Sequence, residues 1–318
     1  MAKKQFVIGI DGGATKTAAS LADINGNVLA EDTAGPSNFQ IIGTQRASEV
    51  IISLIERCCD EVGCTPNEIQ MTVAGLTGAG REGDKERMKF AVLEEARRRK
   101  SGISKVAIES DGRIALEGAF RGKPGIILIA GTGSFALAKD HKGVVHRVGG
   151  WGRILGDEGS GYIIGRDGLN AVTKHLDGRT KATLITKLVA ERFGFVDQEA
   201  IITAVYRENF DIAQVAPLVI EAADKKDSEA ARILNKATFE LSEHVRVLVG
   251  KIEKSSHMRA KIPLSFIGST ITTESVYKRI LEHKITYSLP QVTIVAPQAP
   301  PAYGAVLLAI QSVKSAYG

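Results

Sequence analysis

The strongest constraint on the fold is a pattern of three strands that occurs twice in the chain. In the first copy, "FVIGIDGGATKTAASLADINGNVLAE", a glycine turn follows an apolar strand and Asn25-Gly26 marks a tight hairpin. The second copy, "GIILIAGTGSFALAKDHKGVVHRV", begins at residue 125. The first strand ends 16 residues before the hairpin glycine in one copy (Ile10 to Gly26) and 13 residues before it in the other (Ala130 to Gly143). A duplicated β-β-β unit accounts for both stretches.

Helices and strands alternate after each copy, and the length of 318 residues suits two domains. The pattern predicts strands at 5–10, 17–23, 27–32, 69–74 and 105–108 and helices at 44–62 and 84–100 in the first half. In the second half it predicts a mainly helical region at 160–254, strands at 264–267 and 291–295, and helices at 272–284 and from 303.

The predicted fold class is therefore α/β, with two domains that each contain a mixed five-stranded sheet flanked by helices. The first domain is expected at 1–115, with a terminal helix at 304–318 packed back on it. The second is expected at 116–303 and contains the helical insertion.

Composition and charge exclude several classes of protein. Hydrophobic residues make up 44% and charged residues 24% of the chain, which is typical of a globular protein. The net charge of +5 is spread along the chain apart from "RRRK" at 97–100, so no nucleic-acid partner is expected. Cys58, Cys59 and Cys64 have neither CxxC spacing nor partnering histidines, and the helical pattern places Cys58 in the core. No apolar stretch approaches the roughly 18 residues that span a bilayer, so no membrane association and a cytoplasmic location are expected.

Three loops with glycine follow predicted strands in a way that suits phosphate binding. Backbone N–H groups can point at a phosphate only from a turn that no large side chain obstructs, so glycine and small hydroxyl residues gather there. The loops are "DGGATK", "GTGS" and "FIGST", and two of them occupy equivalent positions of the repeat. The residues expected to bind the nucleotide are Gly12, Gly13, Thr15, Lys16, Gly131, Thr132, Gly133, Gly268 and Ser269. Lys16 is the ambiguous member, because a lysine at a strand edge that points to solvent would look the same.

Two other nucleotide motifs bear on this interpretation. The P-loop pattern G-x-x-x-x-G-K-[ST] is absent. "GAGREG" at 78–83 matches the dinucleotide fingerprint G-x-G-x-x-G, and Glu109 follows the next predicted strand. This stretch lies within the first half of the chain, after its β-β-β unit, and it is not at the start of a βαβ unit. A nicotinamide enzyme is therefore the weaker alternative.

The motifs "IGIDGGATKT", "AGTGS", "GGWGRILGDEGSG" and "FIGST", in this order, resemble the N-acetylglucosamine kinase-like sugar kinases. "GPSN" and "ESDG" add to the likeness, which covers nearly the whole chain. These kinases belong to the BadF/BadG/BcrA/BcrD ATPase family of the actin/hexokinase/Hsp70 superfamily. The resemblance implies two ribonuclease-H-like domains around a nucleotide and sugar cleft, with ATP and Mg²⁺ as cofactors and a small-molecule sugar as substrate. Dimers are frequent in the family, so a homodimer is the precedent.

The resemblance also implies the reaction, which is phosphorylation of the 6-hydroxyl of N-acetylglucosamine. Glucosamine kinase or a broad-specificity hexokinase is the alternative of the same class. A third class is the ATPase activator of a benzoyl-CoA reductase or 2-hydroxyacyl-CoA dehydratase, which holds an iron–sulfur cluster through spaced cysteines, whereas Cys58 and Cys59 are adjacent. A non-enzymatic actin-like scaffold would keep the glycine turns but would not need the "GGWG" segment.

Phosphoryl transfer needs neutralised phosphate charge and a positioned base beside the attacking hydroxyl. Asp11, at the end of a strand, could hold hydrated Mg²⁺, because that ion usually takes one or two carboxylates plus phosphate oxygens. An ordinary turn aspartate is the alternative role for Asp11. Asp111 resembles the catalytic aspartate of the family. By position alone, Asp111 would be the N-cap of a helix that starts near Gly112, and the two roles can coexist.

The remaining site residues are assigned through the resemblance. Those expected to bind the sugar are Asn38, Asp111, Ser134, Phe135, Gly150, Trp151, Gly152, Asp157 and Glu158. Alternatively, Glu158 favours the N-terminus of the following helix, and Trp151, the only tryptophan, is a core residue. Two positions depart from the family pattern. Ala222 stands near the adenine where a glycine is usual, and Phe135 stands where a small or polar residue is common.

Overall fold

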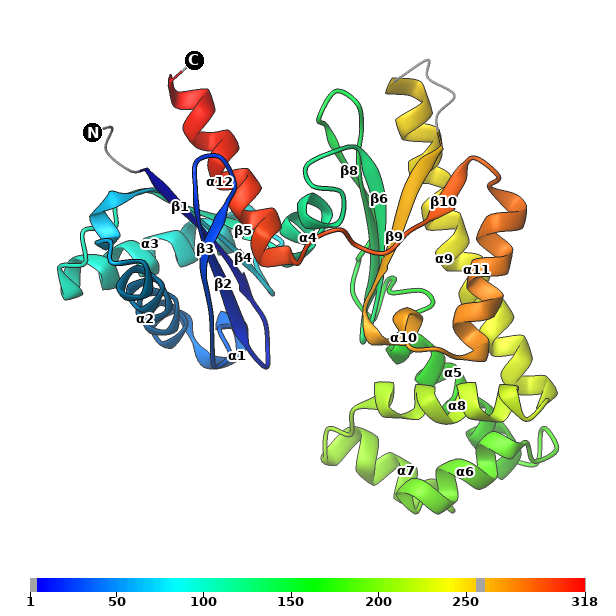
Figure 1. Cartoon of the computed structure of the whole chain (residues 1–318). Helices are drawn as coiled ribbons and strands as arrows, with labels where there is room; N and C mark the ends of the chain where they lie inside the picture. Colours follow the sequence, from blue (N-terminus) through cyan, green and yellow to red (C-terminus); the bar gives the residue numbers. More distant parts are fainter. Residues whose placement is uncertain (1–4, 256–260, 318) are drawn as a thin grey trace. The chain divides into compact units, whose positions relative to one another are not determined.

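The computed structural model describes residues 5–255 and 261–317, which form two compact units (Figure 1). The first unit comprises Met1–Lys123 together with Pro297–Gly318, and the second comprises Pro124–Ala296. The first boundary lies beyond the expected residue 115 because helix α4 (Asp111–Ala119) packs in the first unit. The return to the first unit begins before the expected residue 304, where Gln298 N donates to the carbonyl oxygen of Ala119 at 3.0 Å. Residue 318, expected in the last helix, lies outside the described residues.

The sheet of the first unit has the strand order β3-β2-β1-β4-β5. Its strands are β1 (Phe6–Gly12), β2 (Thr17–Asp23), β3 (Val28–Ala34), β4 (Ile69–Leu76) and β5 (Val106–Ser110). The β1–β2 and β2–β3 pairs are antiparallel, whereas β4 pairs with β1 and with β5 in parallel. The sheet is therefore mixed, with the antiparallel hairpins on one side of β1 and the parallel strands on the other.

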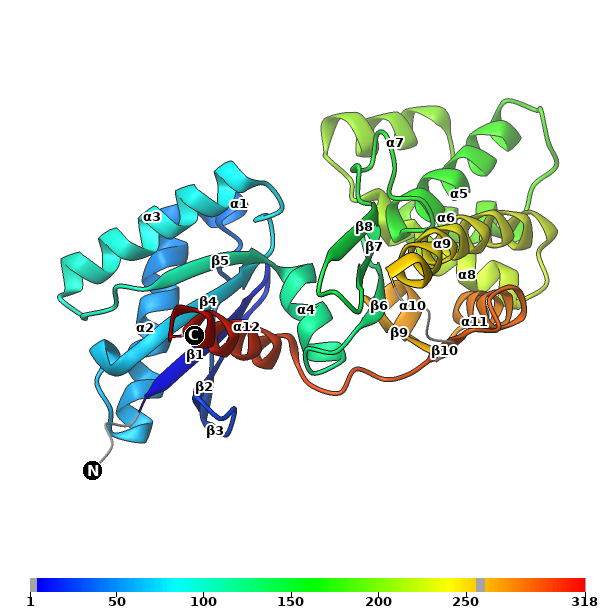
Figure 2. The same cartoon turned by 90° about the horizontal axis from the view of Figure 1, so that it is seen from above.

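Helices cover both faces of this sheet, as Figure 2 shows. They are α1 (Phe39–Ile42), α2 (Thr44–Val62), α3 (Glu82–Arg99), α4 and α12 (Pro301–Tyr317), with a 3₁₀ turn at Pro66–Glu68. Because side chains alternate along a strand, Ile8 packs with the core under α2 and α3, and its neighbour Val7 packs with α12. A Cβ on Gly9 would lie 2.3 Å from the carbonyl oxygen of Ala302, so only glycine lets α12 come this close to β1.

The second unit repeats the same sheet in the order β10-β9-β6-β7-β8. Its strands are β6 (Gly125–Ala130), β7 (Ser134–Lys139), β8 (Val145–Gly149), β9 (Ile262–Ile267) and β10 (Val292–Ile294). The β6–β7 and β7–β8 pairs are antiparallel, and β9 pairs in parallel with β6 and with β10, which is the pattern of the first unit. The predicted pair of mixed five-stranded sheets is confirmed.

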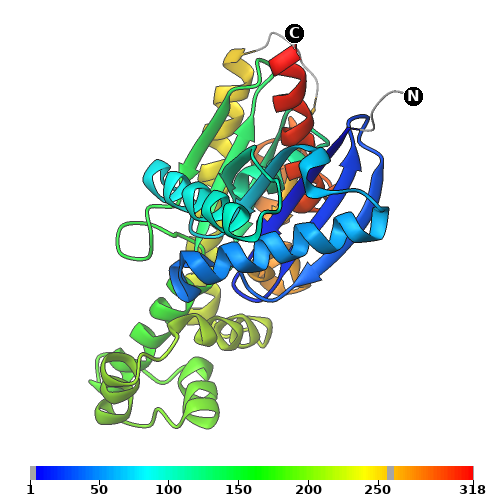
Figure 3. The ribbon, with the colours of Figure 1, turned by 90° about the vertical axis from the view of Figure 1, so that its left-hand side faces the viewer.

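The helical insertion of the second unit gathers beyond one end of its strands, in green and yellow-green in Figures 1 and 3. The helices of this unit are α5 (Gly161–Leu176), α6 (Leu184–Phe193), α7 (Gln198–Ile202), α8 (Ala216–Asp224), α9 (Ser228–Ser255), α10 (Ser269–Thr272) and α11 (Val276–Ser288), with short turns of other helix types at Thr203–Arg207 and Ile212–Val215. The helix predicted at 272–284 begins later because Ser275 caps α11 and accepts a hydrogen bond from Lys278 N. Among the described helices, none is both long and apolar enough to cross a membrane.

Candidate active site

The first glycine turn joins β1 to β2 and is closed by its own backbone. Gly12 is buried, and a Cβ there would lie 2.2 Å from Ser37 Oγ, so close packing requires this glycine. The N–H of Gly13 donates to the carbonyl oxygen of Lys16 at 3.0 Å. That amide therefore closes the turn and is not free for a phosphate. Thr15 and Lys16 are exposed at the tip, where the hydroxyl and the ammonium are available to an anion.

Asn38 is held against the same turn. Its N–H donates to the carbonyl oxygen of Gly13 at 3.1 Å, and its side-chain oxygen caps the short helix α1 by accepting from Gln40 N at 3.1 Å. The Asn38 side chain is 9% exposed. Because its oxygen is used by the cap, the part of this amide available to a ligand is the NH₂ donor.

Asp111 lies at the point where β5 passes into α4, and both of its carboxylate oxygens accept hydrogen bonds. Thr77 Oγ1 donates to Oδ2 at 2.8 Å, and Gly112 N donates to Oδ1 at 2.7 Å. The predicted N-cap role of Asp111 is wrong, because Ser110 caps α4 and accepts from Arg113 N at 3.1 Å. Asp111 is instead the first residue of the helix, and its carboxylate is oriented from two sides.

Asp11 is the second carboxylate of this region. Burial raises its pKa to about 6, helped by the negative charge of Asp111 and opposed by Lys16. Two neighbouring carboxylates fit the ligand set of Mg²⁺, which takes one or two carboxylates and keeps several waters. Within the described residues, no group of three or more His, Cys, Asp or Glu side chains could hold a metal ion, so a site built entirely from such ligands does not fit.

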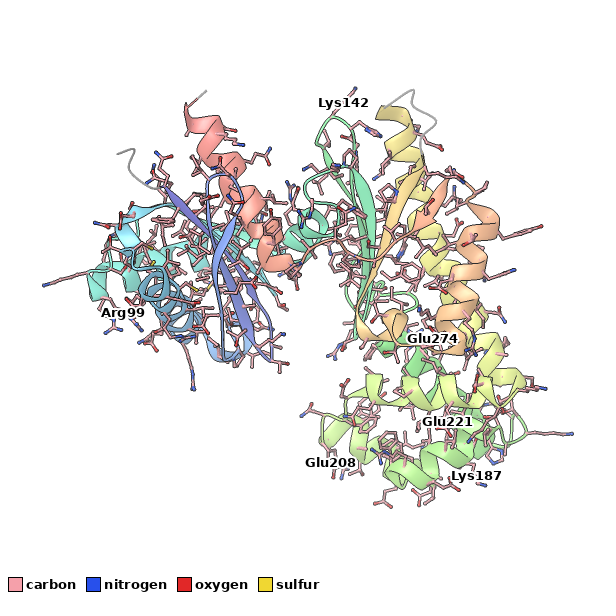
Figure 4. The ribbon with its side chains drawn as sticks, in the orientation of Figure 1. Arg99, Lys142, Lys187, Glu208, Glu221 and Glu274 are labelled. Atoms are coloured by element: carbon pink, nitrogen blue, oxygen red, sulfur yellow. The ribbon has the colours of Figure 1, made fainter. Side chains whose placement is uncertain are left out.

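The second unit contains a cavity of about 620 Å³ at the second and third glycine loops. Gly131 and Thr132 of the β6–β7 turn line it, together with Ser269 and Thr270 after β9. Its walls come from 211–221, Asp224 and 273–279, and include Glu221 and Glu274, which Figure 4 labels. The size suits a nucleotide, because ligand pockets run from about 300 to 1,000 Å³.

The third loop approaches the second at Gly268. This residue has φ +97°, and a Cβ on it would lie 2.4 Å from the carbonyl oxygen of Ala130. The carbonyl oxygen of Gly131 accepts from Gly161 N at 2.8 Å and from Thr270 Oγ1 at 3.2 Å. The two loops and the start of α5 are thereby fixed on one side of the cavity.

Of the predicted nucleotide residues in the second unit, Gly131, Thr132 and Ser269 line the cavity, whereas Gly133, Ala222 and Gly268 do not. Ala222 is fully buried in the core on α8, and Ile220 and Glu221 of the same helix line the cavity instead. Gly133 faces Asp157, whose Oδ2 would lie 3.0 Å from a Cβ on that glycine.

The segment from Gly149 to Asp157 has an unusual backbone. Gly149, Gly150 and Gly152 have φ of +74°, +72° and +83°, and Asp157 has φ +58° although it carries a side chain. Non-glycine residues held in this region cost free energy and cluster at functional sites. Trp151 is 76% exposed, so its predicted alternative as a core residue is wrong.

Ser134 makes two hydrogen bonds to the end of this segment. Its side chain is buried, its Oγ donates to the carbonyl oxygen of Glu158 at 2.6 Å, and its N–H donates to Asp157 Oδ1 at 3.4 Å. Burial raises the pKa of Asp157, while the N–H groups of Ser134 and Gly152 act in the opposite direction. The donor of the Ser134 hydroxyl is therefore already used in a hydrogen bond that holds the segment.

Glu158 and His244 lie close together, and each has a buried polar atom without a hydrogen-bond partner among the described residues. Glu158 Oε2 lies 3.8 Å from His244 Nε2. Among the described residues, neither Glu158 Oε2 nor His244 Nδ1 has a hydrogen-bond partner, although both atoms are buried. Burial lowers the pKa of His244. Because unpaired buried acceptors are costly, a hydroxyl donor at Glu158 would be stabilising.

Sequence reasoning missed Thr77, Arg147 and His244. Thr77 contacts Asp111 from the turn that follows β4, and His244 reaches the segment from α9. The guanidinium carbon of Arg147 lies over the Phe135 ring, 5.0 Å from its centre. No local pattern marks these residues, because their roles depend on contacts between elements far apart in the sequence.

The cysteines do not suit a cluster shared between subunits. Cys58 and Cys59 are fully buried in the core under α2, and burial raises the pKa of the Cys58 thiol to about 11. Neither of these thiols is exposed at the surface, and Cys64 is the one partly exposed cysteine. The iron–sulfur activator hypothesis therefore lacks its ligands in this part of the chain.

The duplicated mixed sheet, with glycine loops at equivalent turns, defines a protein of the actin-like ATPase fold. The chain belongs to the BadF/BadG/BcrA/BcrD ATPase family, whose profile matches residues 8–309. It is 33% identical over 324 residues to the N-acetyl-D-glucosamine kinase of Dictyostelium discoideum, covering 98% of this chain and 99% of that one. It is 31% identical over 308 residues to the N-acetylmuramic acid/N-acetylglucosamine kinase of Clostridium acetobutylicum, covering 96% and 98%.

Solved structures give the same fold. A candidate N-acetylglucosamine kinase from Chromobacterium violaceum has a TM-score of 0.72 at 27% identity, covering 97% of this chain and all of that one. A glucokinase from Streptomyces griseus, solved with glucose and AMPPNP, has a TM-score of 0.52 at 15% identity, covering 96% and 98%. The second likeness shows the fold alone.

Proposed function

We propose that this protein transfers the γ-phosphoryl group of ATP to the 6-hydroxyl of N-acetylglucosamine. The two curated relatives named above support this choice of sugar. The observation that carries the proposal is the orientation of Asp111 by Thr77 and by its own helix N-terminus, beside the second carboxylate of Asp11.

Asp111 is the general base. Each of its oxygens accepts one hydrogen bond from the protein and keeps lone-pair capacity for the sugar hydroxyl. The base accepts the hydroxyl proton as the oxygen attacks the γ-phosphorus, and the bond to the β-phosphate oxygen breaks. A positioned base contributes about 10² to 10⁴ in rate.

Asp11 is the residue that would hold Mg²⁺. When bound, Mg²⁺ neutralises charge that develops on the phosphates. Asp11 must be ionised to act as a ligand, and its raised pKa shows that burial and Asp111 both disfavour that charge in the free protein.

The cavity of the second unit would bind the nucleotide. Ala216, Pro217 and Ile220 supply an apolar wall for the base, and Thr132, Ser269 and Thr270 supply hydroxyls toward the phosphates. In place of Ala222, we assign the contact with the base to Ile220 and Glu221, which line the cavity.

The segment from Gly150 to Glu158 would bind the sugar. Asp157 and Glu158 present acceptors to vicinal hydroxyls, and the exposed indole of Trp151 offers an apolar wall. In the first unit, Asn38 keeps the role that the resemblance implies, with its amide NH₂ available to a ligand. Ser134 acts on the sugar only through the segment that it holds.

ADP release in the presence of Mg²⁺ and a panel of sugars tests the proposal. The panel is N-acetylglucosamine, N-acetylmuramic acid, glucosamine and glucose, each at several concentrations. The expected result is the highest kcat/KM with N-acetylglucosamine. A rate of ADP release that no sugar stimulates would overturn the proposed function, whereas a preference for another sugar would leave the kinase assignment and change its substrate.

A further inference from the structure

The turn at Gly149 and Gly150, where the segment proposed to bind the sugar begins, lies between two side chains. A Cβ on Gly149 would lie 2.8 Å from the imidazole carbon Cε1 of His244, and a Cβ on Gly150 would lie 2.0 Å from Nη2 of Arg147. His244 belongs to α9 and Arg147 to β8, the edge strand of the sheet. The left-handed turn is therefore bordered by an imidazole and by a guanidinium.

The guanidinium of Arg147 makes two hydrogen bonds to this turn. Its Nη2 donates to the carbonyl oxygen of Gly150 at 2.8 Å, and its Nε donates to the carbonyl oxygen of Gly149 at 3.3 Å. Arginine presents these donors in a rigid plane, so one side chain can fix both carbonyls. The Arg147 side chain is exposed to solvent. Its two hydrogen bonds to adjacent carbonyls nevertheless hold its guanidinium against the turn.

Strand pairing supplies the second contact of Arg147. Phe135 on β7 stands opposite Gly149 on β8 in the antiparallel register. The guanidinium carbon of Arg147 lies 5.0 Å from the centre of the Phe135 ring, which is a cation–π distance. Phe135, the aromatic residue that departs from the family pattern, thus packs against the guanidinium of Arg147.

Arg147 also acts on Asp157 electrostatically. The charged groups that influence this carboxylate are Glu158, which raises its pKa, and Arg147, which lowers it. The other groups that face it are the uncharged N–H groups of Ser134 and Gly152. The charge of Arg147 therefore favours the ionised form of Asp157, but this influence is weaker than that of burial, which raises the pKa, and weaker than that of the Ser134 N–H, which lowers it.

We propose that Arg147 is a positioning residue of the sugar site, which fixes the Gly149–Gly150 turn through its planar donors while its guanidinium packs on the Phe135 ring. The inference rests on the proposed function, because it takes the Gly150–Glu158 segment as the sugar site. Arg147 touches no reacting atom in this account and acts through the turn.

The planar donors and the charge can be separated by substitution. Arg147→Lys keeps the positive charge but loses the planar pair of donors, whereas Arg147→Met keeps much of the side-chain length and loses both. Arg246→Met is the matched control, because Arg246 is an exposed arginine of the same unit whose guanidinium pairs with Glu243.

The fluorescence of Trp151, the only tryptophan and an exposed one, reports sugar binding without turnover. In Arg147→Met we expect the dissociation constant for the sugar to rise about tenfold or more, since hydrogen bonds from a charged donor are the stronger ones. The KM for ATP should stay within about twofold and kcat should fall less than the sugar affinity. In Arg147→Lys the affinity should also fall.

The pH dependence of sugar binding distinguishes positioning from a general loss of structure. The charge of Arg147 lowers the pKa of Asp157, so that pKa should be higher in Arg147→Met than in the wild type. As the pH is lowered, Arg147→Met should therefore lose sugar binding at a higher pH than the wild type does. Arg147→Lys retains the charge and should keep the wild-type acid limb. Arg246→Met should match the wild type in both measurements.

Each outcome decides one question. A wild-type protein that shows neither a Trp151 response to sugars nor sugar-stimulated ADP release contradicts the proposed function itself. A responding wild type with unchanged sugar affinity in Arg147→Lys and Arg147→Met contradicts the role of Arg147. If Arg147→Met does not fold, Arg147→Lys decides alone, because wild-type affinity in that variant overturns the planar-donor role.

Discussion

The two units share one sheet topology but carry different chemistry. In the first unit the strand of the first glycine turn contains Asp11, and Asp111 follows the last strand. In the second unit the equivalent turn begins at Gly131 without a carboxylate, and the third strand leads into the sugar segment at Gly149. Duplication therefore supplied two similar sheets. The carboxylates proposed to react lie in one unit, and the cavity and the segment proposed to bind the sugar lie in the other. The predictions below test this division of roles, from the largest expected effect to the smallest.

Asp111→Asn should lower kcat by about 10² to 10⁴, because an amide cannot accept the hydroxyl proton. The KM for ATP should change little, since the nucleotide cavity belongs to the second unit. Steady-state ADP release and nucleotide binding measure the two effects. Activity within a few-fold of the wild type would remove Asp111 from the role of base.

Asp11 should give the activity an acid limb near pH 6 at low Mg²⁺. The pKa of Asp11 is raised to about 6, so the ionised form that binds the metal is lost as the pH falls through this value. Higher Mg²⁺ should move the limb to lower pH, because the cation favours the ionised carboxylate. Rate profiles at several Mg²⁺ concentrations measure this, and a limb that does not respond to Mg²⁺ would contradict the role of Asp11.

Gly268→Ala should weaken ATP binding by about tenfold and destabilise the second unit by about 2 kcal/mol, because it combines a left-handed φ with a clash against the Ala130 carbonyl. Gly143→Ala is the matched control, since Gly143 has φ +82° but no atom within 4 Å of an added Cβ. Thermal unfolding and the KM for ATP should therefore separate the two variants. Equal effects in both would mean that backbone strain alone is responsible.

Thr77→Val should lower kcat by about tenfold or less, which corresponds to the loss of one hydrogen bond to Asp111. Thr72→Val is a suitable control, because Thr72 is a buried threonine of β4, the strand that leads to Thr77, and its hydroxyl has no hydrogen-bond partner among the described residues. The kcat of the Thr72 variant should stay near that of the wild type. A similar loss of kcat in both variants would indicate a general effect on β4.

The sequence predicted the strands well because their signals are local. The glycine turns and Asn25-Gly26 mark chain reversals within a few residues, and the structure has β2 at the predicted 17–23. The start of α11 was predicted four residues early, because the short helix α10 and the cap at Ser275 lie within one polar stretch. Local composition does not separate two helices that close together.

The site was predicted only in part, and the reason is tertiary. Asp111 and Asp157 stand in motifs and could be assigned by resemblance. Thr77 and Arg147 became visible only through contacts across strands and turns. Gly12 was expected to donate to phosphate, which stays a prediction, and the structure adds that packing against Ser37 requires a glycine at this position.

The most direct test of the central claim is the identity of the product. Phosphorus NMR of a reaction with ATP, Mg²⁺ and N-acetylglucosamine should show a new phosphomonoester coupled to the C6 protons, and 6-deoxy-N-acetylglucosamine should give none. A sugar phosphate formed at another carbon would contradict the assigned hydroxyl, and ADP without any sugar phosphate would contradict the kinase reaction.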